Sequence, residues 1–97
     1  MLYVWTANFR SNVSREQSDA ALMRRAGWQY PSGIKVLGEY WLGGSPTVIV
    51  IFETDSYEPI MELGMTWGDV FEIECKPAVT AEDGLRIGPE VMARRPA

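Results

Sequence analysis

The stretch PTVIVIFE at residues 46–53 contains five consecutive apolar residues, from Val48 to Phe52. A short run of β-branched and aromatic residues is typical of a strand. Because a strand that is apolar on both faces has to be covered on both sides, we expect this segment at the centre of a sheet. Pro46 stands at its start, where a missing N–H does not interrupt the ladder.

The residues before this stretch predict its neighbours. Ile34 to Leu42 (IKVLGEYWL) is expected to be a strand, and Gly43-Gly44-Ser45 is a tight-turn signal between the two apolar runs. Leu2 to Phe9 (LYVWTANF) predicts a first strand. A capping box from Ser14 to Gln17 then opens a helix that is expected to stop at Gly27. Its expected apolar stripe is Leu22, Met23 and Ala26.

A second helix and a fourth strand follow the apolar run. Asp55-Ser56 is the expected cap of this helix, Pro59 lies in its first turn, and Gly64 is expected to end it. Its apolar stripe is Ile60, Met61 and Leu63. Val70 to Val79 (VFEIECKPAV) alternates apolar and charged residues, as a half-exposed edge strand does.

The predicted order is strand, helix, strand, strand, helix, strand. This is the split βαβ arrangement of the α+β ferredoxin-like fold, an antiparallel sheet with both helices on one face and the first and third strands in its centre. The two helices cover one face only, although the central strands are apolar on both. We therefore expect a homodimer that stacks sheet to sheet.

The chain divides at about residue 80. Residues 1–80 form the expected domain, and residues 81–97 form a tail outside it. In the tail, Thr80 to Asp83 can cap one turn, Ile87 to Pro89 is expected to be irregular, and Glu90 to Arg95 to form a short helix. The tail is either disordered or lies on a partner subunit.

Composition excludes several classes of protein. The chain has 97 residues, a net charge of −4 and scattered basic residues, which argues against a nucleic-acid surface. No apolar run reaches the ~20 residues that cross a bilayer. The start shows no secretory leader and Cys75 is the single cysteine, so we expect a cytoplasmic protein.

Histidine is absent from the sequence. The commonest general base at neutral pH and the usual ligand of zinc, copper and haem iron are therefore missing. We expect neither a metal site nor a cofactor, and any catalysis would have to use carboxylates, Tyr, Lys or Arg.

Several short signatures are spread over residues 1–80: Met1-Leu2-Tyr3-Val4, Phe9-Arg10, Val36-Leu37-Gly38 with Trp41, Glu53-Thr54-Asp55, Trp67-Gly68-Asp69 and Pro77. In these the chain resembles a family of small uncharacterised bacterial and archaeal proteins of the dimeric α+β barrel type. The resemblance implies a fold and a homodimer but no reaction. The wider group includes cofactor-independent monooxygenases and haem-degrading enzymes, whose pocket between sheet and helices is lined by an Asn of the first strand and a Trp. The haem enzymes also need an axial His, which this chain lacks.

The candidates for catalysis are Asn8 and Glu53. Asn8 sits at a place comparable to the Asn of those enzymes. Glu39 and Glu53 are carboxylates within otherwise apolar strands, where a buried one would have a raised pKa and could act as a base, and Glu53 ends the central strand. The plainer interpretations are that Asn8 caps a strand end and that Glu39 and Glu53 are partly solvated or pair with Lys35 or Arg10.

Aromatic residues suggest a ligand site. Trp5, Tyr40, Trp41 and Trp67 could line a pocket for a small apolar or aromatic ligand, or they could fill the core and the dimer interface. Cys75 is expected to be a buried, inert thiol.

Three functions remain open. The first is a homodimeric small-ligand-binding or accessory protein without chemistry of its own. The alternative is a cofactor-independent monooxygenase or isomerase acting on a small aromatic or quinone-like substrate, and the third is a structural partner that uses the tail. A closed pocket lined by Asn8, Glu53 and a Trp would favour the enzyme.

Overall fold

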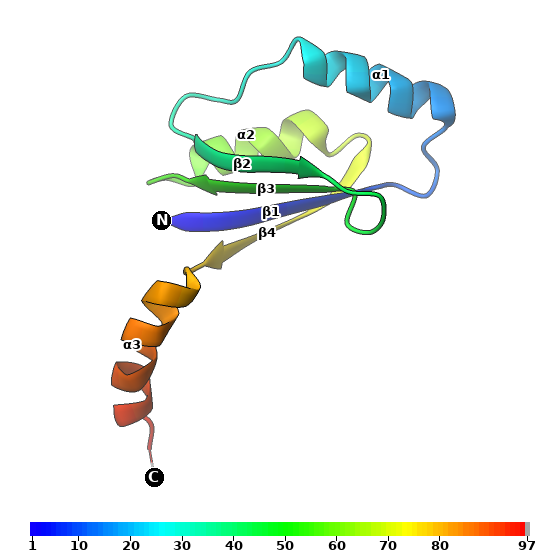
Figure 1. Cartoon of the computed structure of the whole chain (residues 1–97). Coiled ribbons are helices and arrows are strands. Elements are labelled where there is room, and N and C mark those ends of the chain that lie inside the picture. Colours follow the sequence, from blue (N-terminus) through cyan, green and yellow to red (C-terminus); the bar gives the residue numbers. More distant parts are fainter. Residues whose placement is uncertain (97) are drawn as a thin grey trace.

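Figure 1 shows the computed structural model, which describes residues 1–96 as one antiparallel sheet with three helices. In chain order the elements are β1 (Leu2–Phe9), α1 (Arg15–Ala26), β2 (Lys35–Trp41), β3 (Val48–Glu53), α2 (Glu58–Trp67), β4 (Phe71–Ala78) and α3 (Ala81–Ala93). The sheet order is β2-β3-β1-β4, so the two strands predicted to be central are central. The predicted ferredoxin-like α+β fold is confirmed.

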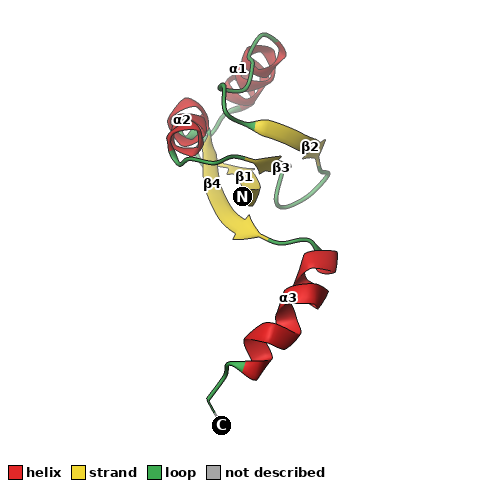
Figure 2. Cartoon of the chain, turned by 90° about the vertical axis from the view of Figure 1, so that its left-hand side faces the viewer, coloured by secondary structure: helices red, strands yellow, loops and turns green. Residues whose placement is uncertain are grey.

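The two faces of the sheet have different surroundings. Helices α1 and α2 lie on one side, whereas α3 points away from the body on the other (Figures 1 and 2). Trp5 pairs with Val50 on the helix side, and both are buried. We call the opposite side the open face; its central strands carry Val4, Thr6, Ile49 and Ile51.

The edge strand β4 alternates as predicted. Phe71, Ile73 and Cys75 point toward the helices, and Glu72, Glu74 and Lys76 lie exposed on the open face. The core beneath α1 and α2 consists of Trp5, Ala7, Ala21, Val50, Phe52, Ile60, Leu63, Trp67, Val70 and Phe71.

Helix α1 begins and ends as predicted, but its apolar stripe was predicted wrongly. The Ser14 N–H donates to Gln17 Oε1 at 2.8 Å and the Gln17 N–H donates to Ser14 Oγ at 3.1 Å, which is the capping box. Ala21 is the one buried residue of α1, while Met23 is 72% exposed and Leu22 is half exposed. The reason is that α1 stands off the sheet and leaves a cavity below it.

Helix α2 is longer than predicted. It begins after Tyr57, which makes no side-chain cap, so Asp55-Ser56 is not its N-cap, and it runs through Gly64 to Trp67. A glycine inside a helix costs only about 1 kcal/mol. Burial of Leu63 and Trp67 on either side of Gly64 outweighs that cost.

The tail is more regular than predicted. Residues 81–93 form one continuous helix that passes through Gly88 and Pro89. Thr80 is its N-cap, because the Asp83 N–H donates to Thr80 Oγ1 at 3.0 Å. The cap at Thr80 and a helix from Glu90 onward were predicted, whereas Ile87 to Pro89, predicted to be irregular, lie within the same helix.

Candidate functional site

A cavity of about 320 Å³ lies between α1 and the helix side of the sheet. Its floor includes Val48 and Val50 of β3, and Leu22 of α1 borders it from above. Its aromatic lining residues are Trp5, Phe9, Trp28, Tyr30, Trp41, Trp67 and Phe71. A cavity of this size and apolar lining falls within the ~300–1,000 Å³ of small-molecule sites.

The structure places three of the four aromatic candidates at this cavity. Trp5 and Trp67 form part of its wall and are buried, and Trp41 stands at its rim with 58% of its surface exposed. Tyr40 does not line the cavity. It pairs with Ile49 of β3, and its side chain lies on the open face, as residue 38 does.

The structure brings neither catalytic candidate to the cavity. Asn8 lies on the open-face side of β1, where its Oδ1 accepts a hydrogen bond from Ser45 Oγ at 2.9 Å. Glu53 is exposed at the end of β3, opposite Lys35 of β2. The two side chains therefore do not form a site with the tryptophans.

A β-bulge brings the carboxylate of Glu39 into the cavity wall. The register between β2 and β3 shifts between Val36 and Gly38, so Leu37 is the additional residue. Without this shift Gly38 and Tyr40 would share the face of Val36. With it, Glu39 and Trp41 point toward the helices instead.

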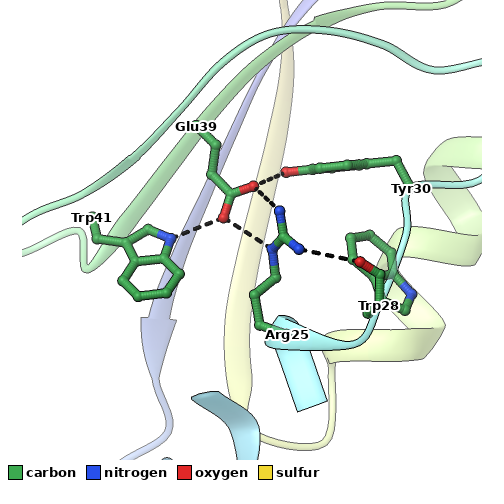
Figure 3. A network of polar contacts seen from close by, with 5 residues as sticks. All are labelled: Arg25, Trp28, Tyr30, Glu39 and Trp41. Atoms are coloured by element: carbon green, nitrogen blue, oxygen red, sulfur yellow. Dashed lines mark hydrogen bonds and ion pairs between the residues drawn. The ribbon is translucent and has the colours of Figure 1, made fainter. Parts of the chain in front are cut away.

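Glu39 is the centre of a hydrogen-bond network (Figure 3). Its Oε1 accepts from Arg25 Nη2 at 2.7 Å and from Tyr30 OH at 2.6 Å. Its Oε2 accepts from Arg25 Nε at 3.1 Å and from Trp41 Nε1 at 2.8 Å. Four donors thus occupy both carboxylate oxygens, and Arg25 Nη1 donates in addition to the Trp28 carbonyl at 3.2 Å.

The network keeps Glu39 ionised. Burial alone raises the pKa of this carboxyl, but hydrogen bonds from Arg25, Tyr30 and Trp41 and the charge of Arg25 outweigh burial and lower the pKa to about 2. A general base at neutral pH needs a pKa near the operating pH and a free lone pair facing the substrate. Glu39 has neither, so it is a fixed structural anion.

The partners of Glu39 also hold their protons. Burial, together with the hydrogen bond and the charge of Glu39, raises the pKa of Tyr30 far above its usual range. The hydrogen bond with Glu39 raises the pKa of Arg25 despite partial burial. The cluster therefore stays one cation, one anion and one neutral phenol at every ordinary pH.

A second arginine, Arg24, contacts the wall of the cavity that Trp67 forms. The Arg24 guanidinium lies 4.5 Å from the centre of the Trp67 ring and makes two hydrogen bonds with Asp69, at 3.0 and 3.1 Å. Trp67 in turn meets Trp28 edge to face at 5.4 Å. The aromatic wall is thus held from both α1 and α2.

Within residues 1–96 no three His, Cys, Asp or Glu side chains come together in a way that could bind a metal ion. Over the same range, each helix is too short or too polar to cross a bilayer.

Residues 1–92 match the model of a protein family described as a domain of unknown function, DUF3303. The chain belongs to this family. No curated protein and no solved structure matches the chain. The DUF3303 match extends to Met92, past the end of the resemblance at residue 80, and includes all but the last residue of α3.

In this DUF3303 domain, the sequence pattern did not reveal Arg25 and Tyr30 as site residues. Gly38 was the available signal, because a glycine within a strand often marks a bulge. A Cβ on Gly38 would lie 2.7 Å from the Tyr40 ring, so this ring would have to move if residue 38 carried a side chain.

Proposed function

We propose that this DUF3303 protein is a homodimer that binds a small, uncharged aromatic molecule in the cavity between α1 and the sheet. The observation that carries the proposal is the cavity itself: an apolar, aromatic-lined space of about 320 Å³ whose polar wall has no unsatisfied group.

The charges around the cavity favour a neutral ligand. Arg25 and Glu39 neutralise each other, and all their bonds are directed within the network. Asp19 of α1, which also lines the cavity, would repel an anion. Affinity would come from burial of apolar area, at about 25 cal/mol per Å², and from stacking on tryptophan.

The proposal includes a second copy on the open face. Val4, Ile49 and Ile51 form an apolar strip there that neither α1 nor α2 covers. Apolar patches of this kind commonly mark interfaces. The compartment we propose is the cytoplasm, since the single cysteine, Cys75, is half buried and free.

Catalysis is not part of the proposal. A cofactor-independent oxygenase or isomerase would need a base that faces the ligand, and the candidates Asn8 and Glu53 lie outside the cavity. Glu39 is saturated with donors. A fixed, fully bonded wall suits binding better than proton transfer.

The test is a titration with N-phenyl-1-naphthylamine, a neutral aromatic probe whose fluorescence rises in apolar surroundings. We expect saturable binding of one probe per chain, accompanied by a change in tryptophan emission. A linear, non-saturating response, or saturation with no effect on tryptophan emission, would contradict a ligand cavity at this place.

A further inference from the structure

Helix α3 stands apart from the rest of the chain. It leaves the end of β4 through only Val79 and Thr80 and runs away from the body (Figures 1 and 2). No residue of the helix, 81–93, is buried, and Leu85 is 80% exposed. Even so, residues 81–93 form a continuous helix that Thr80 caps. The family match extends over this helix to Met92.

The side chains of α3 are sorted onto two sides. At 100° per residue one side carries the apolar stripe, which consists of Ala81, Gly84, Leu85, Gly88, Val91 and Met92. The opposite side carries Glu82, Asp83, Arg86 and Glu90. A helix sorted in this way buries its apolar side against another surface, and this chain provides none at that position.

The chain exposes more surface area than a compact monomer of its mass does. A compact monomer of 10.9 kDa exposes about 5,600 Å², whereas this chain exposes 7067 Å². Its radius of gyration is 16.4 Å, against about 12.5 Å for a compact domain of this length. The excess area, about 1,500 Å², is larger than the roughly 800 Å² that each partner contributes to a stable dimer.

We propose that α3 is an exchanged arm, whose apolar stripe packs on the open face of a second copy of this chain. The inference rests on the proposed homodimer and specifies how it is built. Each copy has one arm and one open face, so a twofold pair satisfies both surfaces at once. Gly84 and Gly88 belong to this stripe, and because they carry no side chain they let the helix backbone approach the sheet closely.

The chain's own open face is the competing place for the arm. Reaching it requires the chain to reverse between Ala78 and Ala81. Thr80 is extended, with φ −68° and ψ 159°, and its side chain is committed to the helix cap. The connection therefore directs the helix away from its own sheet, and a second copy is the surface that remains.

Disulfide trapping tests the arm in the full-length protein. Cys75 is first replaced by Ser, and one population then carries Leu85→Cys while the other carries Ile51→Cys. The two populations are mixed, allowed to exchange subunits and mildly oxidised. We expect the mixture to form at least ten times more covalent dimer than either population alone. Glu90→Cys, on the polar side of α3, is the matched control and should link weakly to Ile51→Cys.

A second measurement does not depend on oxidation. Leu85→Glu should weaken dimerisation at least tenfold by light scattering, while Ala93→Glu, on the polar side, should leave it unchanged. Because Leu85 is exposed in the single chain, its replacement should leave folding intact, which circular dichroism checks.

Four outcomes overturn the arm. If wild type is monomeric, the proposed homodimer fails along with it. If wild type is a dimer but Leu85→Glu associates as wild type does, or no Leu85–Ile51 link forms, only the arm fails. A chain carrying both Leu85→Cys and Ile51→Cys that closes a disulfide within itself at high dilution would place α3 on its own sheet. Binding of the naphthylamine probe is scored separately, so the two proposals can fail independently.

Discussion

Arg25 Nε and Nη2 donate hydrogen bonds to the two carboxylate oxygens of Glu39, at 3.1 and 2.7 Å. The pair links the last turn of α1 to the edge strand β2 at one wall of the cavity (Figure 3). Both side chains are largely shielded from solvent, with 31% and 17% of their surface exposed. Paired arginine and carboxylate groups in this two-bond geometry are among the stronger polar contacts in proteins.

Replacing Glu39 should therefore destabilise the fold. In Glu39→Gln the charge that faces Arg25 is lost, and one of the oxygens that accept hydrogen bonds becomes a donor. We expect a loss of about 1–3 kcal/mol in the free energy of unfolding at neutral pH. Urea denaturation measures it. Glu53→Gln is the matched control, because Glu53 is exposed, and it should change stability by no more than about 0.5 kcal/mol.

The same residue predicts a pH dependence. The pKa of Glu39 is about 2 in the folded protein, against an ordinary value of 4.5. The unfolded chain therefore takes up this proton at higher pH, so the stabilisation from Glu39 is complete above about pH 5 and is lost as the pH falls toward 2. The gap in stability between wild type and Glu39→Gln should shrink over that window. A gap that stays constant would show that Glu39 titrates normally.

Tyr30→Phe should have a smaller effect of the same kind. It removes the donor that lies 2.6 Å from Glu39 Oε1 and leaves both bonds from Arg25 in place. We expect a loss of about 0.5–1.5 kcal/mol at neutral pH. With one donor fewer, the pKa of Glu39 should rise toward its ordinary value, so the loss of stability on acidification should begin at the same pH as in wild type but be smaller and end at a higher pH. If stability falls with acid in Tyr30→Phe in the same way as in wild type, the Tyr30 hydroxyl does not stabilise the carboxylate.

Much of the fold could be predicted because strands and caps leave local signals. Alternation in β4, the doubly apolar run of β3 and the Ser14–Gln17 box are all readable within a few residues. The extent of the helices was less predictable. Gly64 and Gly88 are poor helix formers, yet α2 continues through the first because Leu63 and Trp67 pack on the core, and that packing is a tertiary effect.

The site could be predicted only in part. Trp5, Trp41 and Trp67 were expected near a ligand because aromatic residues on strands and helix ends face the core. Glu39 shares a strand face with Trp41, two residues later, but the extra residue at Leu37 decides that this face is the one toward the helices. Its partner Arg25 is fourteen residues away in sequence and is brought close only by the α1–β2 connection.

Filling the cavity should weaken ligand binding. Leu22 of α1 lines the cavity and its neighbour Met23 does not. Leu22→Trp places an indole in the space, so we expect at least tenfold weaker binding of N-phenyl-1-naphthylamine, which corresponds to about 1.4 kcal/mol. Met23→Trp adds the same side chain on the solvent side of α1 and should bind like wild type. Equal affinities for the two variants would place the probe elsewhere.

Lysine at two adjacent positions of β3 should separate folding from association. Val50 is 3% exposed beneath the helices, whereas Ile49 points to the open face. Val50→Lys buries a charge without a partner and should destabilise the fold by several kcal/mol in urea. In Ile49→Lys a single chain can extend the ammonium group into solvent, so its fold should persist.

A second copy on the open face would bury that charge, so light scattering should show a monomer for Ile49→Lys and a dimer for wild type. A dimer of undiminished affinity in Ile49→Lys would show that the open face is not the interface, and loss of folding in both variants would show that β3 is covered on both sides within one chain.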